Sequence, residues 1–409
     1  MTVKISKFKP LEVLFVVTMG IAFVHQLDGY IVPNYIKYGF SLIWISIWLF
    51  QAKVKKKDFR IVSIFISPYL WIGIMSIVFW VVSSHPMIGA AYLGNLAAHV
   101  GYAVLRALFV LAALEIFKRK AFNLTFKALI FSEIIILAYV GTSYGFVNLL
   151  HYCISGVFKS VVNGFEWGTP LWHVGWAMEV HDNTFAFGTF LLYFLFCNND
   201  SKKDRKRGII ISCLFVYLGL KRIEILAIAC VAVVVAAKKV LKASYGLISQ
   251  ICTIVYLIIA YLFIAVIKWA PGQFSVLDIH RVALYRFLSS QLQIESLVIG
   301  KGFSIINDYL LNYNTGSSLL TSSHSDLVRM AIELGILFFT LWVIYYLYVI
   351  PKKLERLTGN EHVAFVSFLC FFFVFITYFI DNTLELFAVQ TMCMMVPIGL
   401  YKREEEMRG

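Results

Sequence analysis

The chain has few charged residues and no extended polar stretch. Only 14% of its 409 residues are charged, whereas 60% are hydrophobic, and the mean hydropathy is +0.80. One water-soluble core cannot bury so much apolar side chain, so the composition excludes an ordinary soluble domain and predicts lipid as the solvent. Cysteine is also scarce outside the apolar runs: only Cys153 falls in a predicted outward loop. A disulfide within those loops is therefore excluded.

Apolar runs long enough to cross a bilayer follow one another along the chain. A crossing helix needs roughly 20 such residues, because lipid offers no hydrogen-bond partner to an open backbone. The sequence predicts an all-α polytopic membrane protein of about twelve transmembrane helices, forming a single integral membrane domain over 1–409. No small-x-small cleavage site follows the first run, so we expect an uncleaved anchor there. The predicted spans are 11–27, 31–50, 61–83, 96–117, 124–144, 184–197, 208–220, 223–237, 246–267, 326–348, 363–380 and 384–401.

The basic residues predict the orientation of these spans. Clusters of Lys and Arg fall at alternate connections, as at 202–207 and 238–242, and such clusters collect on the cytoplasmic side of bacterial membranes. Both termini are therefore expected in the cytoplasm. A single tilted span over 208–237 would reverse every later loop, which the basic clusters argue against. The net charge of +13 reflects topology and does not call for nucleic acid as a partner.

Two predicted outward loops are long enough to form a site. The first, 145–183, is rich in Trp and Gly; its aromatic rings suit either the headgroup belt, which we favour, or stacking on sugars. It ends in His181 and Asn183, which open the next span and are candidates for a substrate path. The second, 268–325, contains Arg281–Leu292 with apolar residues at helical spacing, which predicts an amphipathic helix at the membrane surface.

Arg106, Arg329 and Glu333 lie inside predicted spans, where charge is costly and usually functional or paired. Arg106 lies near the middle of its span without a partner nearby in sequence. Arg329 and Glu333 have the i, i+4 spacing of a structural ion pair, which we favour for them. A role of Arg106 and Arg329 in a substrate path is the alternative.

Several short motifs occur in a fixed order between about 180 and 345. They are Leu220-Lys221-Arg222, Arg281-x-x-x-Tyr285, Gly300-Lys301-Gly302-Phe303 and His324-Ser325 ahead of Gly335-Ile336-Leu337. In this order of motifs the chain resembles the O-antigen polymerase and O-antigen ligase superfamily of bacterial surface polysaccharide assembly. The resemblance implies a fold similar to lipid-dependent (GT-C-like) membrane glycosyltransferases in the inner membrane. Phe338 and Lys221 depart from the ligase pattern, which favours a polymerase.

The resemblance implies transfer of a glycan from undecaprenyl diphosphate to a hydroxyl of another glycan, at the periplasmic face. The leaving diphosphate needs cations, and the chain has no Asp-x-Asp with which many glycosyltransferases hold a metal. No metal and no cofactor are therefore expected. Arginine binds phosphate oxygens in pairs, so Arg222 and Arg281 are the first choices for diphosphate binding and Arg286 and Lys221 the second. For Arg222, a cation snorkelling to the interface is an equal alternative.

His324 is the expected general base for the acceptor hydroxyl. Helix capping by this polar segment is the competing interpretation.

Two alternatives to a polymerase stay open at this point. A ligase would transfer the polymer to lipid A core, and a transporter or flippase would move the lipid-linked precursor. The expected partners are membrane lipid, undecaprenyl-diphosphate-linked glycans and a chain-length regulator protein.

Overall fold

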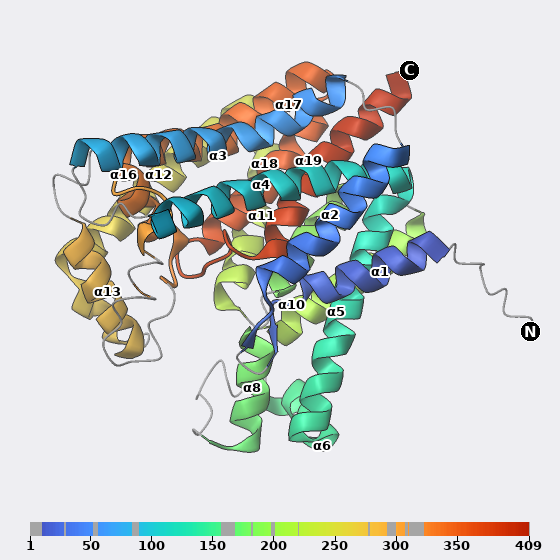
Figure 1. Cartoon of the computed structure of the whole chain (residues 1–409), viewed down its shortest axis with the longest axis horizontal. Helices are drawn as coiled ribbons and strands as arrows, with labels where there is room; N and C mark the ends of the chain where they lie inside the picture. Colours follow the sequence, from blue (N-terminus) through green and yellow to red (C-terminus); the bar gives the residue numbers. More distant parts are fainter. Residues whose placement is uncertain are drawn as a thin grey trace, which may run out of the picture. The chain divides into compact units, whose positions relative to one another are not determined.

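The structure is a computed structural model in which helices form nearly all of the described chain (Figure 1). The chain divides into two compact units, each of which packs mainly within itself. Unit 1 comprises Met1–Lys55, Leu108–Ile225 and Leu386–Arg403, and unit 2 comprises Lys56–Ala107, Leu226–Glu385 and Glu404–Gly409. The described residues are 10–27, 30–51, 56–83, 90–156, 168–180, 183–197, 201–219, 221–276, 279–292, 300–306, 310 and 323–408.

Unit 1 is held together by helices that approach closely through small residues. Helix α1 packs on α5 and α2, and α9 packs along α10. Gly208 and Gly219 of α10 lie against Phe194 and Thr184 of α9, where a Cβ atom would overlap the neighbouring side chain. The elements are α1 Pro10–Phe23, β1 Gln26–Leu27, β2 Tyr30–Ile31, α2 Asn34–Gln51, η1 Lys118–Lys120, α5 Ala121–Tyr144, α6 Phe146–His151, η2 Tyr152–Gly156, α8 Pro170–Val180, α9 Asn183–Phe196 and α10 Lys202–Gly219. Strands β1 and β2 form a short antiparallel pair.

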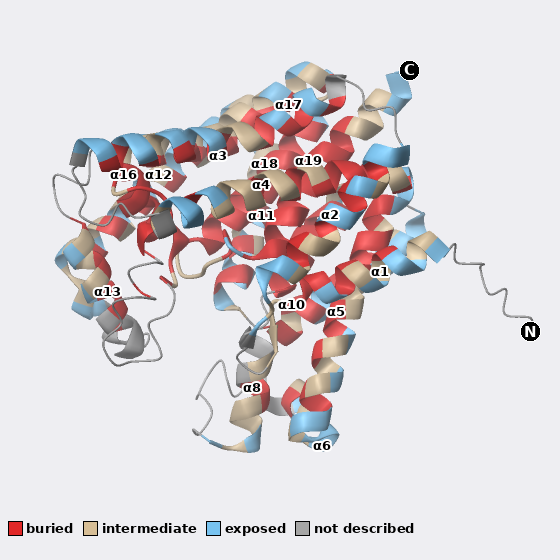
Figure 2. Cartoon of the chain, in the orientation of Figure 1, coloured by how far each residue is buried: buried red, intermediate tan, exposed pale blue. Residues whose placement is uncertain are grey.

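Unit 2 is built around α18, whose residues from Val363 to Thr377 are all buried (Figure 2). Helices α12 and α17 pack against it. The elements are α3 Lys56–Ser83, α12 Tyr245–Trp269, η3 Pro271–Val276, α13 Ile279–Gln291, α16 Asp326–Ile344, η4 Tyr345–Val349, α17 Ile350–Thr358 and α18 Glu361–Thr377. Helices α4 Ala90–Phe117, α11 Arg222–Leu241 and α19 Phe387–Arg408 each contribute residues to both units.

Four helical stretches among the described residues are long and apolar enough to cross a membrane: Asp58–Val82, Tyr92–Tyr144, Tyr245–Trp269 and Asp326–Thr358. The 53-residue stretch contains α4 and α5, and Lys118 interrupts it with a left-handed φ of 48°. Pro10–Phe23, Asn183–Phe196 and Glu361–Thr377 are shorter apolar helices. The structure thus agrees with an all-α membrane protein.

Helix α12 has an exposed apolar face. Leu247, Ile251, Ile254 and Ile258 are exposed and recur every three or four residues, so they form one stripe of the helix. Water-soluble proteins rarely expose a continuous apolar stripe of this length. This exposed apolar face of α12 agrees with a helix in a membrane.

Every apolar run predicted from the sequence overlaps a helix. The predicted break near Gly219 is confirmed, because α10 ends there and α11 begins at Arg222. The described residues of 208–237 thus form two helices, while the number of times that they cross the membrane stays a prediction.

Candidate functional site

The N-terminus of α16 is capped by a serine and not by the neighbouring histidine. The Ser325 hydroxyl accepts a hydrogen bond from the backbone N–H of Val328 over 3.4 Å. His324 is half-buried, and its φ of 44° lies in the left-handed region that bulky residues rarely adopt. Capping is therefore assigned to Ser325, which leaves the His324 imidazole outside the capping hydrogen bond.

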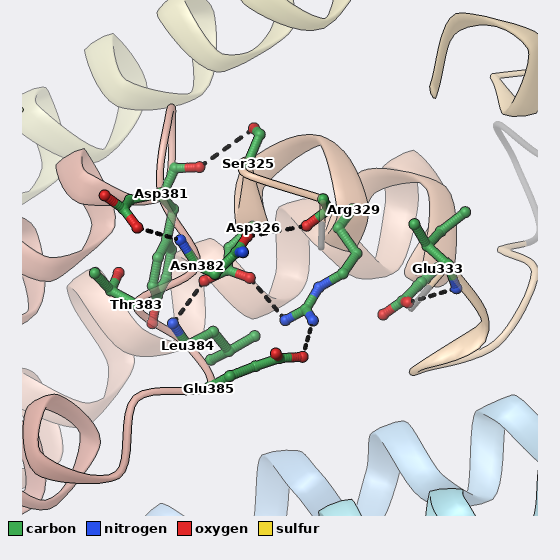
Figure 3. A network of polar contacts seen from close by, with 12 residues as sticks. Ser325, Asp326, Arg329, Glu333, Asp381, Asn382, Thr383, Leu384 and Glu385 are labelled. Carbon is green, nitrogen blue, oxygen red and sulfur yellow. Dashed lines mark hydrogen bonds and ion pairs between the residues drawn. The ribbon is translucent and has the colours of Figure 1, made fainter. Parts of the chain in front are cut away.

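A buried ion cluster follows this cap (Figure 3). Arg329 is 2% exposed; its Nη2 lies 2.7 Å from Asp326 Oδ1, and its Nη1 contacts Glu385 Oε1. The predicted pair of Arg329 with Glu333 is therefore wrong. Asp326 lies one turn before Arg329, and the loop before α19 brings Glu385 to the other side of the guanidinium.

The same loop is tied to the start of α16 through its backbone. Asp326 Oδ2 accepts a hydrogen bond of 2.6 Å from the backbone N–H of Leu384. The backbone N–H of Asp326 donates to the carbonyl of Asp381, and that of Leu327 donates to the carbonyl of Tyr378. Residues 378–385 and the α16 N-terminus therefore form one rigid corner.

Helix α16 is broken at Gly335, whose φ of 72° and ψ of 162° are not helical. The break frees carbonyl groups inside the unit, where an unsatisfied group is expensive. The turn 300–303 satisfies two of them: Lys301 N donates to the Ile332 carbonyl over 3.0 Å and Gly302 N to the Glu333 carbonyl over 2.8 Å. The predicted Gly-x-Gly-Phe motif thus docks on the break in α16.

The Glu333 side chain completes this docking. Its Oε1 accepts a hydrogen bond of 3.1 Å from the backbone N–H of Ile306, just beyond the turn. Trp80 Nε1 donates to the Lys301 carbonyl, and Phe303 N donates to the Ser76 hydroxyl, so α3 holds the turn from the other side. Gly300 leaves no space for a side chain, since a Cβ atom there would overlap the Glu333 carbonyl.

Helix α13 matches the helix predicted in the second outward loop. Its predicted apolar face, which includes Val282, Tyr285 and Leu288, is buried against η3 and α12. Protein therefore covers the apolar face, while the position of the helix at the membrane surface stays a prediction. Arg286 is exposed, while Arg281 lies in the first turn and its side chain is outside the described residues.

Lys301 connects the end of α13 with the docked turn. Its Nζ donates to Gln291 Oε1 over 2.8 Å. Burial lowers the pKa of the Lys301 ammonium from its ordinary value, since desolvation disfavours the charged form.

Lys221 and Arg222 lie at the helix break of unit 1. Arg222 is the exposed first residue of α11, and Lys221 Nζ lies 5.9 Å from the centre of the Phe185 ring. In the same turn of α11, the buried Glu224 carboxylate accepts a hydrogen bond of 2.5 Å from the Thr184 hydroxyl. This bond ties α11 to α9.

The other predicted residues divide between the units. Arg106 is buried in the unit 2 part of α4. Asn183 of unit 1 is buried and donates to the Ser132 hydroxyl over 3.0 Å. His181 lies outside the described residues. Unit 2 thus brings together the His324 motif, the Gly300 turn and α13, whereas Lys221, Arg222 and Asn183 belong to unit 1.

Sequence reasoning missed the loop 378–385 as a part of this site. The signal was present, because Asp381, Asn382 and Glu385 interrupt two apolar runs. Among the described residues, no group of three or more His, Cys, Asp or Glu side chains has a metal-binding arrangement. In comparisons with known proteins, no family model matches the chain and no curated protein matches it.

Proposed function

We propose that the protein is a polymerase of undecaprenyl-diphosphate-linked oligosaccharide repeat units, which builds O-antigen or a related surface polysaccharide. The supporting observation is the docking of the Gly300–Phe303 turn on the broken helix that begins directly after His324-Ser325. Motifs that are separate in the sequence therefore belong to one packed structure in unit 2. The resemblance stated for these motifs connects that structure with glycosyl transfer.

In the proposed reaction, the acceptor hydroxyl oxygen attacks the anomeric carbon of the donor glycan. The bond from that carbon to the diphosphate oxygen breaks, and the lipid diphosphate leaves with the electron pair. His324 accepts the proton of the hydroxyl, a role that typically contributes about 10² to 10⁴ in rate. Arg281, with Arg286 in support, stabilises the charge of the diphosphate without a metal. Arg222 and Lys221, which belong to unit 1, stay sequence-based candidates for diphosphate binding.

The ion cluster has a positioning role in this proposal. Arg329 with Asp326 and Glu385 fixes the corner on which His324 is carried. A base must stay within hydrogen-bond reach of the proton that it takes, so a rigid corner favours proton transfer. Arg329 is accordingly a positioning residue and not a substrate contact.

The proposal includes a membrane arrangement. About twelve helices cross the bacterial inner membrane, with both termini in the cytoplasm, as the basic clusters predict. His324 and the second outward loop then face the periplasm, where the lipid-linked repeat units are joined. A chain-length regulator protein is the proposed protein partner.

A transporter of the lipid-linked precursor is the second candidate, because broken helices and buried charges are typical of transporters. Helix α16 has both features. Its carbonyls at Ile332 and Glu333, however, accept hydrogen bonds from the Gly300 turn, and the Arg329 charge is compensated within unit 2. These groups are therefore engaged in structure, which favours the polymerase.

Deletion of the encoding gene tests the proposal through the surface polysaccharide on a gel. Loss of a polymerase leaves single repeat units on the lipid A core. Bare core with accumulated long lipid-linked polymer would identify a ligase instead, and absence of precursor at the periplasmic face would identify a flippase. Expression of the unchanged chain from a plasmid must restore the long polymer.

A further inference from the structure

Helix α3 contains a proline in the middle of an apolar segment. Pro68 is buried and has no backbone N–H, so it cannot donate the helical hydrogen bond to the carbonyl of Ile64, four residues earlier. Ile64 is buried as well. A carbonyl that lacks its helical donor is costly in an apolar environment, where water does not replace the missing bond. The gap in the hydrogen-bond ladder of α3 therefore needs a donor from a side chain.

Tyr345 supplies this donor. It is the first residue of the π-helix η4, and its hydroxyl donates a hydrogen bond of 3.0 Å to the Ile64 carbonyl. The Ser67 hydroxyl lies 3.0 Å from the Tyr345 hydroxyl and 3.4 Å from the same carbonyl, so it supports the contact. The Nζ atom of Lys353 donates to the Tyr345 hydroxyl over 3.4 Å. Tyr345 thus closes the gap that Pro68 leaves in α3.

The part of α3 that follows the proline holds the docked turn. The Ser76 hydroxyl accepts a hydrogen bond of 2.9 Å from the backbone N–H of Phe303. Trp80 Nε1 donates one of 3.0 Å to the Lys301 carbonyl. The turn in question donates to the carbonyls at the break in α16. The position of this part of α3 therefore decides whether the turn stays on α16.

Helix α3 lies beside one continuous helical stretch, Asp326–Thr358, which contains α16, η4 and α17 (Figure 1). Tyr345 contacts α3 before the proline. The Phe338 ring lies 5.5 Å from the Phe79 ring beyond it, measured between ring centres. A helix bends most readily where a ladder bond is missing, so α3 is weakest at Pro68. The Tyr345 hydroxyl acts at this weak point.

We infer that Tyr345 is a positioning residue for the proposed glycosyl transfer, because it fixes α3 at Pro68 and thereby keeps the Gly300 turn docked on the helix that follows His324-Ser325. The inference rests on the proposed function. Tyr345 acts through α3 and does not touch the substrate. Without its hydroxyl, α3 bends at Pro68 and the turn leaves the break in α16.

Tryptic cleavage after Lys301 measures the docking of the turn in the full-length protein in nanodiscs. The backbone N–H groups of Lys301 and Gly302 are bonded to α16, so a protease reaches this peptide bond when the turn opens. The fragment that begins at Gly302, quantified by mass spectrometry, gives the rate of cleavage at this bond alone. We expect cleavage to be about fivefold faster in Tyr345→Phe than in the unchanged protein, since a buried acceptor loses its donor.

Pro68→Ala restores the missing donor within α3. The N–H of alanine can bond to the Ile64 carbonyl as in a regular helix, which makes the Tyr345 hydroxyl dispensable. Tyr345→Phe should therefore leave the cleavage rate unchanged in the Pro68→Ala background. Loss of packing around the tyrosine ring would not be rescued in this way. Tyr348→Phe is the matched control, because Tyr348 also lies in η4 but its hydroxyl accepts a hydrogen bond from Gln250 of α12.

The same variants are tested for long polymer in a deletion strain, at equal protein level in the membrane. Tyr345→Phe should lower polymer formation about fivefold, and Pro68→Ala should restore it. The inference is overturned if Tyr345→Phe is cleaved at the unchanged rate, if Pro68→Ala does not rescue it, or if polymer stays normal while cleavage rises. If gene deletion itself leaves the polysaccharide unchanged, the proposed function fails, and the cleavage rates still decide whether Tyr345 holds the turn.

Discussion

The backbone N–H of Gly302 donates a hydrogen bond of 2.8 Å to the carbonyl oxygen of Glu333, directly before the break in α16. Together with the bond from Lys301 to Ile332, it allows a helix to be interrupted inside unit 2 without an orphaned carbonyl. Gly300 makes this approach to α16 possible, because a Cβ atom there would overlap the Glu333 carbonyl.

Gly300→Ala tests this docking. A Cβ atom at Gly300 would overlap the Glu333 carbonyl, so the turn must move away from α16. We expect a loss of about 1–3 kcal/mol in stability, seen as a lower Tm in detergent. Gly246→Ala in α12 is the control, because nothing lies within 4 Å of its added Cβ atom. Equal Tm values for the two variants would refute the docking.

Arg329→Met tests the buried ion cluster. It leaves the buried Asp326 and the partly exposed Glu385 without their cation, and breaking a buried pair costs about 3–5 kcal/mol. Lys352→Met breaks the partly exposed pair with Glu355, which is worth about 0–1 kcal/mol. Thermal denaturation of both variants in detergent compares them directly. A Tm for Arg329→Met as high as that for Lys352→Met contradicts the proposed corner.

His324→Gly and Ser325→Ala separate catalysis from capping. Glycine removes the imidazole and accepts the left-handed φ of 44°, so we expect polymer formation to fall about 10² to 10⁴-fold while the protein level in the membrane stays normal. Ser325→Ala removes the cap and should lower stability by about 1 kcal/mol while activity persists. Full activity of His324→Gly would exclude His324 as the base.

Arg281→Lys tests diphosphate binding. Lysine keeps the charge but loses the planar fork that binds two phosphate oxygens. We expect little or no long polymer on a gel from a deletion strain that carries this variant, at a normal protein level in the membrane. Arg207→Lys, an exposed position in the predicted cytoplasmic cluster, should support normal polymer. Unchanged polymer from Arg281→Lys would remove this residue from the mechanism.

Lys301 predicts a pH dependence of stability. Burial lowers the pKa of Lys301 in the folded protein, so the unfolded chain binds more protons at this site. Burial of the charged ammonium lowers the free energy of unfolding. This loss is fully present below the lowered pKa and disappears as the pH rises toward about 10.4, the ordinary pKa of lysine. The Tm of the unchanged protein should therefore rise relative to that of Lys301→Met over this range. A constant difference between the two proteins would contradict the shift.

Local patterns were sufficient for predicting the long apolar helices, but not α6 and α8 in the stretch 145–183 that was predicted as a loop. A crossing segment must satisfy its backbone within itself, so the apolar runs and basic clusters locate helices such as α12 without any tertiary information. The spacing of Val282, Tyr285 and Leu288 likewise predicted the buried face of α13. What covers that face depends on η3 and α12, which the spacing does not reveal.

These local patterns did not predict contacts between residues that lie far apart in the sequence. Glu333 was expected to pair with Arg329 because it lies one turn away. The guanidinium pairs instead with Glu385, which lies 56 residues after Arg329 in the sequence. Lys37 and His25 lie inside predicted apolar runs, where no pattern in the sequence gives them a partner. Their contact required α1 and α2 to be placed side by side.

The sequence alone determined that this protein is helical, that lipid is its solvent and where most of its helices begin and end, because hydropathy and local hydrogen bonding act over a few residues. Tertiary structure alone decided that the Gly300 turn closes the break at Gly335, that Asp326 and Glu385 share Arg329, and that Tyr345 meets the Ile64 carbonyl of α3. Such contacts join residues far apart in the chain, and their free energy depends on packing that no short pattern encodes.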